Sequence, residues 1–276
     1  MKRILLGWIL IGIATSFMAC EQDTTRVEAW LREAASLPED SCRTLHFAKK
    51  LLGTPYVAGT LEVNAREELV VNLDEVDCTT FVEQVLAMAL ADKRDERTEE
   101  GFRKALTQIR YRDGELDGYP SRLHYFSDWI ADNERMGVIE ERTPSLSAEK
   151  QTLHLNFMST HPESYRQLKE DSALVSEMKA VEARWQGVEV SYLPKGRLAE
   201  NPEQLGIKNG DILAITTNIK GLDVVHVGFA CWIGERLHLL HASSVAKKVM
   251  EDPQPLYEYS KTKRTHTGVR VLSFVD

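Results

Sequence analysis

The sequence is poor in the patterns on which several function classes depend. It has four cysteines, Cys20, Cys42, Cys78 and Cys231, and neither a paired CxxC nor an HExxH motif. Zinc sites usually show such spacings, so their absence disfavours a metal protein. Basic residues are in deficit, because 34 Lys and Arg stand against 42 Asp and Glu. A nucleic-acid groove relies on clustered Lys and Arg, so the composition argues against that class as well.

Long apolar runs are also missing, apart from one at the amino end. Residues 4–17 are apolar, follow a Lys-Arg pair and precede small Ala19. This is the order of residues in a secretory signal, and the run is shorter than the roughly 20 residues that a membrane-spanning helix needs. We therefore expect an exported protein, with residues 1–19 as signal peptide and residues 20–26 as a polar tether.

The end of this segment, Ala19-Cys20, resembles the cleavage box of bacterial lipoproteins, in which the cysteine becomes the lipidated first residue. Phe17 and Met18 depart from the residues usual in that box. The resemblance implies a periplasmic or outer-membrane-anchored lipoprotein that meets the membrane only through a lipid on Cys20. Plain secretion, with cleavage nearby, is the alternative.

The remaining residues, 27–276, are predicted to form one α+β domain. Apolar residues recur at helical spacing in the first half, and from Val188 onward the period changes to two. Helices followed by strands favour an α+β arrangement over a doubly wound one. The predicted helices are 27–35, 41–52, one starting at 77–78, one around 102–109 and one around 174–185, the last preceded by a capping box at Thr160 and Glu163. The predicted strands are 69–72, 188–190, 210–215, 222–232, 236–242 and 268–274.

Cys78 is the first candidate for chemistry. It stands at the start of an amphipathic helix whose apolar stripe begins at Phe81. Unpaired backbone amides and the helix dipole at such a position stabilise a thiolate, so we expect the pKa of the thiol to be lowered. The alternative is a buried core cysteine.

His226 and His241 are the candidate partners of Cys78. His226 lies within an apolar strand, where an imidazole is costly unless it is hydrogen-bonded, and Gly228 beside it would leave room for a substrate. If the next strand pairs with it, His241 can orient the His226 ring, as the third member of a Cys-His-polar triad does. Zinc binding by these residues and His238 is the alternative, but alternation sends His238 to the opposite face.

Several short motifs resemble, in order, those of the NlpC-like papain-fold cell-wall hydrolases. The resemblance extends over about residues 43–274, and residues 97–200 are an insertion relative to the smallest members. It implies a papain-like fold in which the nucleophile helix packs on the carboxyl-terminal antiparallel sheet. The motifs are Leu52-Gly53-Thr54-Pro55-Tyr56, Asp77-Cys78-Thr79-Thr80-Phe81-Val82, Gly210-Asp211-Ile212-Leu213, His226-Val227-Gly228 and His241-Ala242-Ser243-Ser244.

The same resemblance assigns roles to five residues. Cys78 corresponds to the nucleophile that attacks an amide of peptidoglycan, His226 to the base and His241 to the residue that orients the base. Tyr56 corresponds to a tyrosine on the substrate and oxyanion side of the site, and Asp77 to the acidic residue before the nucleophile. No metal or organic cofactor is implied. The motifs around Tyr56 and Cys78 depart from the Tyr-x-Trp-Gly-Gly and Asp-Cys-Ser-Gly of the common γ-D-glutamyl-diamino-acid endopeptidases.

Longer strings resemble one branch of this group, formerly a domain of unknown function, that is associated with N-acetylmuramoyl-L-alanine amidase activity. They are residues 53–62 and 121–129. The bond cut would join the lactyl carbonyl of muramic acid to L-Ala. The inserted block would form a wall of the cleft, with Arg122, His124, Tyr125 and Trp129 as candidate contacts to sugar or stem peptide. The alternative is that Tyr125 and Trp129 belong to the core.

Two other functions stay open at this point: an endopeptidase acting farther along the stem peptide, and a peptidoglycan-binding lipoprotein without activity. The substrate is expected to be either polymeric wall or small muropeptides, and the inserted block favours the latter. Cys42 and Cys231 are expected to fill the core, with a disulfide between them as the alternative.

Overall fold

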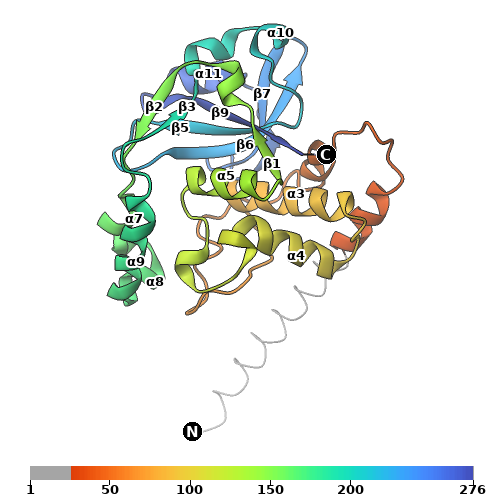
Figure 1. The fold of residues 1–276 in the computed structure, drawn as a ribbon. Helices are drawn as coiled ribbons and strands as arrows, with labels where there is room; N and C mark the ends of the chain where they lie inside the picture. Colours follow the sequence, from red (N-terminus) through yellow and green to blue (C-terminus); the bar gives the residue numbers. More distant parts are fainter. Residues whose placement is uncertain (1–25, 276) are drawn as a thin grey trace, which may run out of the picture.

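The computed structural model describes residues 26–275, so the predicted signal peptide and nearly all of the tether lie outside the described residues. A seven-stranded antiparallel sheet forms the centre (Figure 1), in the order β1-β9-β5-β6-β7-β8, with β4 paired to β9. The strands are β1 (Ile139–Glu141), β4 (Leu193–Pro194), β5 (Ile212–Thr217), β6 (Val224–Ile233), β7 (Arg236–Ser243), β8 (Lys248–Glu251) and β9 (His266–Phe274).

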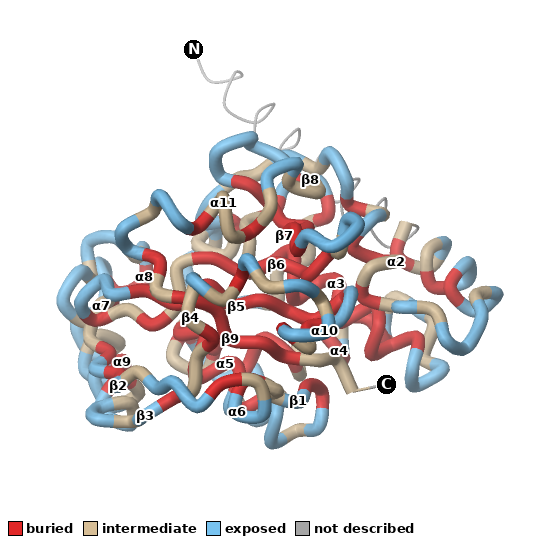
Figure 2. The backbone as a smooth tube through the Cα atoms, turned by 90° about the horizontal axis from the view of Figure 1, so that it is seen from above, coloured by how far each residue is buried: buried red, intermediate tan, exposed pale blue. Residues whose placement is uncertain are grey.

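The middle of this sheet is covered on both faces. Every residue of β5 is buried, and Figure 2 shows the buried backbone concentrated in β5, β6, β9 and α3. A strand buried on both faces is expected to be apolar along its whole length, as Ile212-Leu213-Ala214-Ile215 is. The sheet is therefore a rigid platform for side chains that project from its strand ends.

Helices α3 (Cys78–Lys93), α4 (Glu99–Arg110) and α5 (Phe126–Arg135) cover one face (Figure 1). Thirteen of the sixteen residues of α3 are buried, because its neighbours surround it on all sides. Phe81 of α3 meets Phe229 of β6 edge to face, with ring centroids 5.6 Å apart. This packing fixes the start of α3 against β6. A helix over residues 26–34 and α2 (Arg43–Lys50) complete this side.

The opposite face carries short helices and a second apolar cluster. α10 (Pro202–Leu205) and α11 (Leu256–Lys261) contribute Leu205 and Leu256 to a core shared with Leu213, Leu239 and Val271. α6 (Thr143–Leu146) lies against β9. The segment that ends α11 returns into β9 and so passes close to the β6 and β7 side chains on this face.

A small lobe has a core of its own. Strands β2 (Lys150–Leu153) and β3 (Val188–Ser191) form a separate two-stranded sheet, and α7 (Phe157–Thr160), α8 (Arg166–Glu170) and α9 (Ser172–Ala183) gather beside it (Figure 1). The predicted insertion, residues 97–200, is thus not one body, because α4, α5, β1 and β4 within it belong to the main sheet and its helical cover.

The α+β class, with helices first and an antiparallel sheet later, is confirmed. The predicted strand at 69–72 is wrong, since that segment is extended but pairs with no strand. The capping box at Thr160 is also wrong, because Thr160 ends α7 while α9 is capped by Asp171. Strands β1, β2, β4 and β8 are short and were not predicted. Within residues 26–275 no helix combines the length and the hydropathy needed to cross a bilayer.

Candidate active site

Asp77 and Thr80 fix the start of the helix that carries Cys78. The Asp77 carboxylate accepts a hydrogen bond from the Thr80 amide at 2.8 Å, and the Asp77 amide donates to the Thr80 hydroxyl at 2.9 Å. This reciprocal capping box satisfies two amides of the first turn. Asp77 therefore has a structural role in addition to its predicted place beside the substrate, and it sets Cys78 as the first residue of α3.

The Cys78 thiol is half-buried and lies next to β6. The backbone amide of Val227, the residue after His226, donates to the sulfur, and the Cys78 amide also faces it. Burial raises the pKa of the thiol to about 12, with a further contribution from the Asp77 carboxylate. The predicted lowering of this pKa is wrong, because desolvation and Asp77 together exceed the effect of the helix amides. Cys78 is thus a thiol at neutral pH.

His226 and His241 form a directly bonded pair. Nε2 of His226 lies 2.6 Å from Nδ1 of His241, and the two rings meet edge to face with centroids 4.8 Å apart. Gly228 makes this contact possible, since a Cβ at that position would lie 2.8 Å from Cβ of His241. The expectation that Gly228 leaves room for a substrate is corrected: the room is taken by His241.

A β-bulge aims His226. The register between β5 and β6 shifts between Ile215 and Thr216, where Ile215 pairs with His226 and Thr216 pairs with Val224. The extra residue, Val225, disrupts the ladder locally and bends the strand, as bulges beside active sites often do. Simple alternation along β6 consequently fails at this end of the strand.

Asp252 extends the pair into a chain of three groups. Its Oδ2 lies 3.3 Å from Nε2 of His241, a buried nitrogen without a hydrogen bond of normal geometry. Burial lowers the pKa of His241, and Asp252 opposes this shift. The pKa of His226 is lowered well below its usual value, by burial first and then by His241 and Lys263. His226 is therefore a neutral imidazole at neutral pH.

Two tyrosines stand near the sulfur. Tyr56 is held by backbone contacts to Lys247 and Val76, and burial raises the pKa of its phenol to about 12, with further contributions from Cys78 and Asp77. Tyr259 of α11 likewise has a pKa raised to about 12, by burial and then by Asp252 and Cys78. Both phenols remain protonated at neutral pH and can donate hydrogen bonds.

A cavity of about 390 Å³ opens beside the start of α3. Asp77 and Thr79 line it on the helix side, and Arg122 and His124 line it from the inserted segment. His124 has its Nε2 2.9 Å from the Tyr119 carbonyl, and burial lowers the pKa of its ring well below the usual value. These two of the four predicted contacts thus reach a cavity next to Cys78.

Arg122 is already neutralised within this cavity. Its guanidinium contacts the carboxylates of Glu62 and Glu67, the latter at 3.1 Å, and lies over the Tyr119 ring with its central carbon 4.9 Å from the centroid. Only 7% of Arg122 is exposed. A guanidinium between two carboxylates has little charge left for a third, so Arg122 supports the wall of the cavity.

Tyr125 and Trp129 are not available for contact with a ligand. The Tyr125 hydroxyl donates to Glu182 at 2.7 Å and accepts from the Met158 amide at 2.9 Å, which ties the small lobe to α5. Trp129 is 0% exposed and stacks on Phe126 with centroids 4.6 Å apart. The prediction that these aromatic residues contact the substrate is corrected to core positions, because Trp129 lies on the buried face of α5 and Tyr125 is held by its bonds to Glu182 and Met158.

His238, Cys42 and Cys231 take no part in the group of side chains around Cys78. His238 points away from the pair and has its Nδ1 2.8 Å from the Asp252 carbonyl. Residues 26–275 contain no group of His, Cys, Asp and Glu side chains that could hold a metal ion. Cys42 and Cys231 are free thiols, so they form no disulfide with each other. Cys42 is exposed at the start of α2, which corrects its predicted place in the core.

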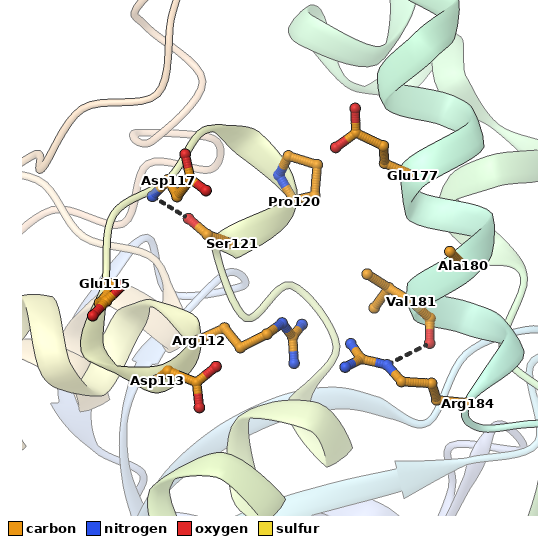
Figure 3. Close-up of a pocket in the computed structure, with 10 residues that line it drawn as sticks. All are labelled: Arg112, Asp113, Glu115, Asp117, Pro120, Ser121, Glu177, Ala180, Val181 and Arg184. Atoms are coloured by element: carbon orange, nitrogen blue, oxygen red, sulfur yellow. Dashed lines mark hydrogen bonds between the residues drawn. The ribbon is translucent and has the colours of Figure 1, made fainter.

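A further hollow, of about 530 Å³, lies between residues 112–121 and α9. Figure 3 shows the guanidinium ends of Arg112 and Arg184 directed toward each other across it. Both bind one carboxylate, that of Asp128, at 2.5 Å and 3.5 Å. The residues that line this hollow include neither a cysteine nor a histidine, and its arginines serve to join α9 to α5.

Asp252, Tyr259 and Lys263 were not predicted from the sequence. All three come from the segment between β8 and β9, where no periodic pattern marks them. Their common signal is spatial, because this segment crosses the face on which His226 and His241 lie.

The chain is similar to a known protein family and to several proteins of known structure. Residues 46–269 match the AmiA-like family, described as N-acetylmuramoyl-L-alanine amidase-like. A crystal structure of an N-acetylmuramoyl-L-alanine amidase from Bacteroides uniformis is 46% identical, with a TM-score of 0.81, over 85% of this chain and 98% of that one. A Bacteroides fragilis structure named as a putative xylanase is 50% identical, with a TM-score of 0.79, over 83% of this chain and 100% of that one.

A more distant structure shares the fold. A Legionella pneumophila protein of the DUF1460 family is 22% identical, with a TM-score of 0.71, over 95% of this chain and 97% of that one. Among curated proteins none matches the chain. The family match covers well over half of the residues, and the Bacteroides uniformis amidase aligns over nearly its whole length. The chain therefore belongs to the AmiA-like, N-acetylmuramoyl-L-alanine amidase-like family.

Proposed function

We propose that the protein is a cysteine-dependent amidase that cleaves the bond between the lactyl carbonyl of muramic acid and L-Ala. The observation that carries this proposal is the chain of groups behind Cys78. His226 directly precedes Val227, whose backbone amide donates to the Cys78 sulfur. His241 lies 2.6 Å from His226, and Asp252 lies 3.3 Å from His241. A nucleophile, a base and orienting groups arranged in this spatial order are typical of enzymes that catalyse acyl transfer.

The contacts favour one arrangement of protons. With Nε2–H of His241 directed at the Asp252 carboxylate 3.3 Å away, Nδ1 of His241 is free to accept from Nε2–H of His226. Nδ1 of His226 then carries a lone pair and is the nitrogen left to act as base. A neutral thiol and a neutral imidazole are the resting forms, so the proton moves as the substrate carbonyl approaches.

In acylation, His226 takes the proton of Cys78 while the sulfur attacks the amide carbonyl. Negative charge then develops on the carbonyl oxygen. The Cys78 amide, which is unsatisfied within the first turn of α3, and the protonated Tyr56 phenol are the donors available for it. His226 returns the proton to the leaving nitrogen of L-Ala, and the muramoyl group stays on the sulfur as a thioester.

In deacylation, a water molecule attacks this thioester with His226 as base. The sulfur leaves as a thiolate and recovers its proton from His226. His241 and Asp252 keep the imidazole in one tautomer through both halves of the reaction, so that the same nitrogen always faces the sulfur. The chain's own residues suffice for each proton transfer.

The description of the Bacteroides fragilis relative as a putative xylanase raises glycan cleavage as a second activity. Glycoside hydrolases of the usual kind use two carboxyl groups on either side of the bond that is cut. Beside Cys78, the Asp77 carboxylate is occupied as a helix cap and the Asp252 carboxylate lies against His241. The geometry supports amide hydrolysis and not this alternative.

The place of action is part of the proposal. Residues 1–19 have the order of a secretory signal, and Cys20 stands where a lipid would be attached. We propose an exported protein that meets peptidoglycan or its muropeptide fragments outside the cytoplasm. Labelling cells with a palmitate analogue tests the lipid, because Cys20→Ser would remove the label and Cys42→Ser would not.

Product analysis on defined muropeptides tests the activity. Mass spectrometry of the wild-type digest should show a free peptide that begins at L-Ala, together with muramic acid bearing a free lactyl carboxylate. Cys78→Ala should abolish both products while circular dichroism stays unchanged. Cys42→Ser, which alters another free thiol, is the matched control and should retain activity.

Three results would contradict the proposal in different ways. Muramoyl-L-Ala-D-Glu as a product would indicate a stem endopeptidase. Binding of muropeptides without any product would indicate a non-catalytic binding protein. Turnover by the folded Cys78→Ala variant would reject the cysteine mechanism itself.

A further inference from the structure

Lys263 places an ammonium group beside the two histidines. Its Nζ lies 3.3 Å from the centre of the Tyr259 ring, and that ring lies 6.5 Å from the His226 ring and 5.8 Å from the His241 ring, centroid to centroid. Lys263 follows the end of α11, so one short element holds both Tyr259 and Lys263 over this side of the sheet. The ammonium therefore borders the space in which the proposed reaction occurs.

The positive charge of Lys263 affects the pKa values of the side chains around it. It contributes to the lowered pKa values of His226, His241 and His266. Its own pKa is lowered, because burial disfavours the ammonium more than the Asp252 carboxylate stabilises it. Within residues 26–275 no carboxylate oxygen lies within 4.0 Å of the Lys263 ammonium, so Lys263 forms no ion pair there.

Two fully buried guanidinium groups of this protein have carboxylate partners. Arg110 contacts Glu83 at 2.7 Å, and Arg270 contacts Glu141 at 2.6 Å. Lys263, beside the histidines, has no such partner in a chain whose net charge is −8. A partly buried cation without a counter-ion costs free energy, and an anionic ligand group would offset that cost.

We propose that Lys263 binds the free α-carboxylate of the D-glutamate that follows L-Ala in the stem peptide. This inference rests on the proposed amidase function. D-Glutamate is joined through its side chain, so its α-carboxylate stays free one residue beyond the cleaved bond. Because consecutive Cα atoms are about 3.8 Å apart, that carboxylate lies on the order of 6–8 Å from the carbonyl under attack.

The position of Tyr259 agrees with such a span. The Tyr259 ring meets the His241 ring edge to face, with centroids 5.8 Å apart, and the Lys263 ammonium rests on the Tyr259 ring. A substrate whose carbonyl meets the sulfur would extend its leaving group along this ring toward Lys263. Lys263 would then select stem peptides with a free α-carboxylate over those in which it is amidated.

Binding to the inactive Cys78→Ala protein tests this directly. Two probes are used, N-acetylmuramoyl-L-Ala-D-Glu and N-acetylmuramoyl-L-Ala-D-isoglutamine, which differ only in an α-carboxylate or α-amide. Calorimetry compares Lys263 with Lys263→Met and Lys263→Arg. The control is Lys179→Met, which alters another lysine without a carboxylate partner, on exposed α9.

Lys263→Met should weaken binding of the carboxylate probe about tenfold, as expected for the loss of about 1.4 kcal/mol, and binding of the amide probe less than about twofold. Lys263→Arg should keep most of the discrimination, and Lys179→Met should change neither value. Equal weakening of both probes, no weakening, or no binding of either probe to the Cys78→Ala protein would overturn the inference. Cleavage assays with the wild-type enzyme on longer muropeptides then show separately whether the amidase function itself stands.

Discussion

His226 and Arg122 are almost equally buried, with 8% and 7% of their surfaces exposed, yet their surroundings differ in kind. Arg122 sits between Glu62 and Glu67 and over Tyr119, so its charge is balanced within the protein. His226 bonds through one nitrogen to His241, and no hydrogen bond within residues 26–275 engages the other. A buried charge that its neighbours balance serves stability, whereas a buried imidazole with an unused lone pair can serve chemistry.

The largest expected effect comes from removing the base on the histidine side. His226→Ala should lower kcat by about 10³-fold, because general-base catalysis typically contributes 10²–10⁴-fold. The free energy of unfolding should fall by only about 1–3 kcal/mol, since the variant leaves Nδ1 of His241 without its buried partner but keeps the ion-pair network intact. Steady-state kinetics on muropeptides measure the effect, with the exposed His154→Ala as control. A His226→Ala enzyme that keeps most of its activity would contradict the assignment of His226 to chemistry and of Arg122 to stability.

Trp129→Ala should show the opposite behaviour. The indole lies wholly in the core, so its removal should lower the free energy of unfolding by about 3–5 kcal/mol. The specific activity of the folded fraction should stay near the wild-type value, since no part of the ring reaches the cavity beside Cys78. Urea denaturation gives the stability, and kinetics well below the unfolding midpoint give the activity. A selective rise in KM without loss of stability would restore Trp129 as a contact to the substrate.

Arg122→Met should destabilise the fold by about 3 kcal/mol, because it leaves the carboxylates of Glu62 and Glu67 without their cation. Lowering the pH should recover part of this loss, since burial raises the pKa of the Glu67 carboxyl and its protonation removes part of the unpaired charge. Thermal unfolding between pH 5 and pH 8 would show the recovery. The double variant Arg122→Met with Glu67→Gln serves as control and should be less destabilised than Arg122→Met alone.

A smaller effect is expected from the end of the histidine chain. Asp252→Asn should lower kcat about tenfold with little change in KM, because it weakens control of the His241 tautomer. Asp252 raises the pKa of His241, so its neutralisation should also move the acid limb of the pH profile to lower pH. A role confined to stability would reduce the amount of folded enzyme and leave that limb in place.

The smallest expected effect is on the stability of the protein in acid, to which a buried histidine in each of the two regions contributes. Burial lowers the pKa values of His226 and His124 well below the usual range, so the unfolded chain binds protons that the folded chain does not. The free energy of unfolding should therefore fall as the pH drops below about 6.5. His226→Gln and His124→Gln should each flatten this slope, and urea titrations at pH 5 and pH 7.5 measure it. An unchanged slope in both variants would contradict the burial of neutral imidazoles.

Local pattern predicted the elements that carry the site. The apolar stripe after Cys78 predicted α3, and alternation around His226 and His241 predicted the hairpin of β6 and β7, all of which the structure contains. Helices and strands of this length leave a strong periodic signal because one face of each must be buried. The short strands β1, β4 and β8 leave none, since their place depends on pairing with strands far away in the chain.

The candidate site was predictable only in part. Residue type and position marked Cys78, His226 and His241, but equally marked Trp129, which the structure buries in the core. Asp252, Tyr259 and Lys263 belong to a segment without periodicity, and only its path across the sheet brings them to the histidines. A contact between residues distant in the chain is a property of packing, which a single sequence does not display.

The sequence by itself determined the α+β class, the start of the nucleophile helix and the pairing of the two histidine strands, because these follow from local periodicity and capping. Tertiary structure alone decided the protonation state of the site. The helix start favours a thiolate at Cys78, but burial against β6 and the neighbouring Asp77 raise its pKa to about 12. Desolvation depends on what surrounds a group in space, so the burial that sets this pKa comes from the fold and not from the residues next to Cys78 in the chain.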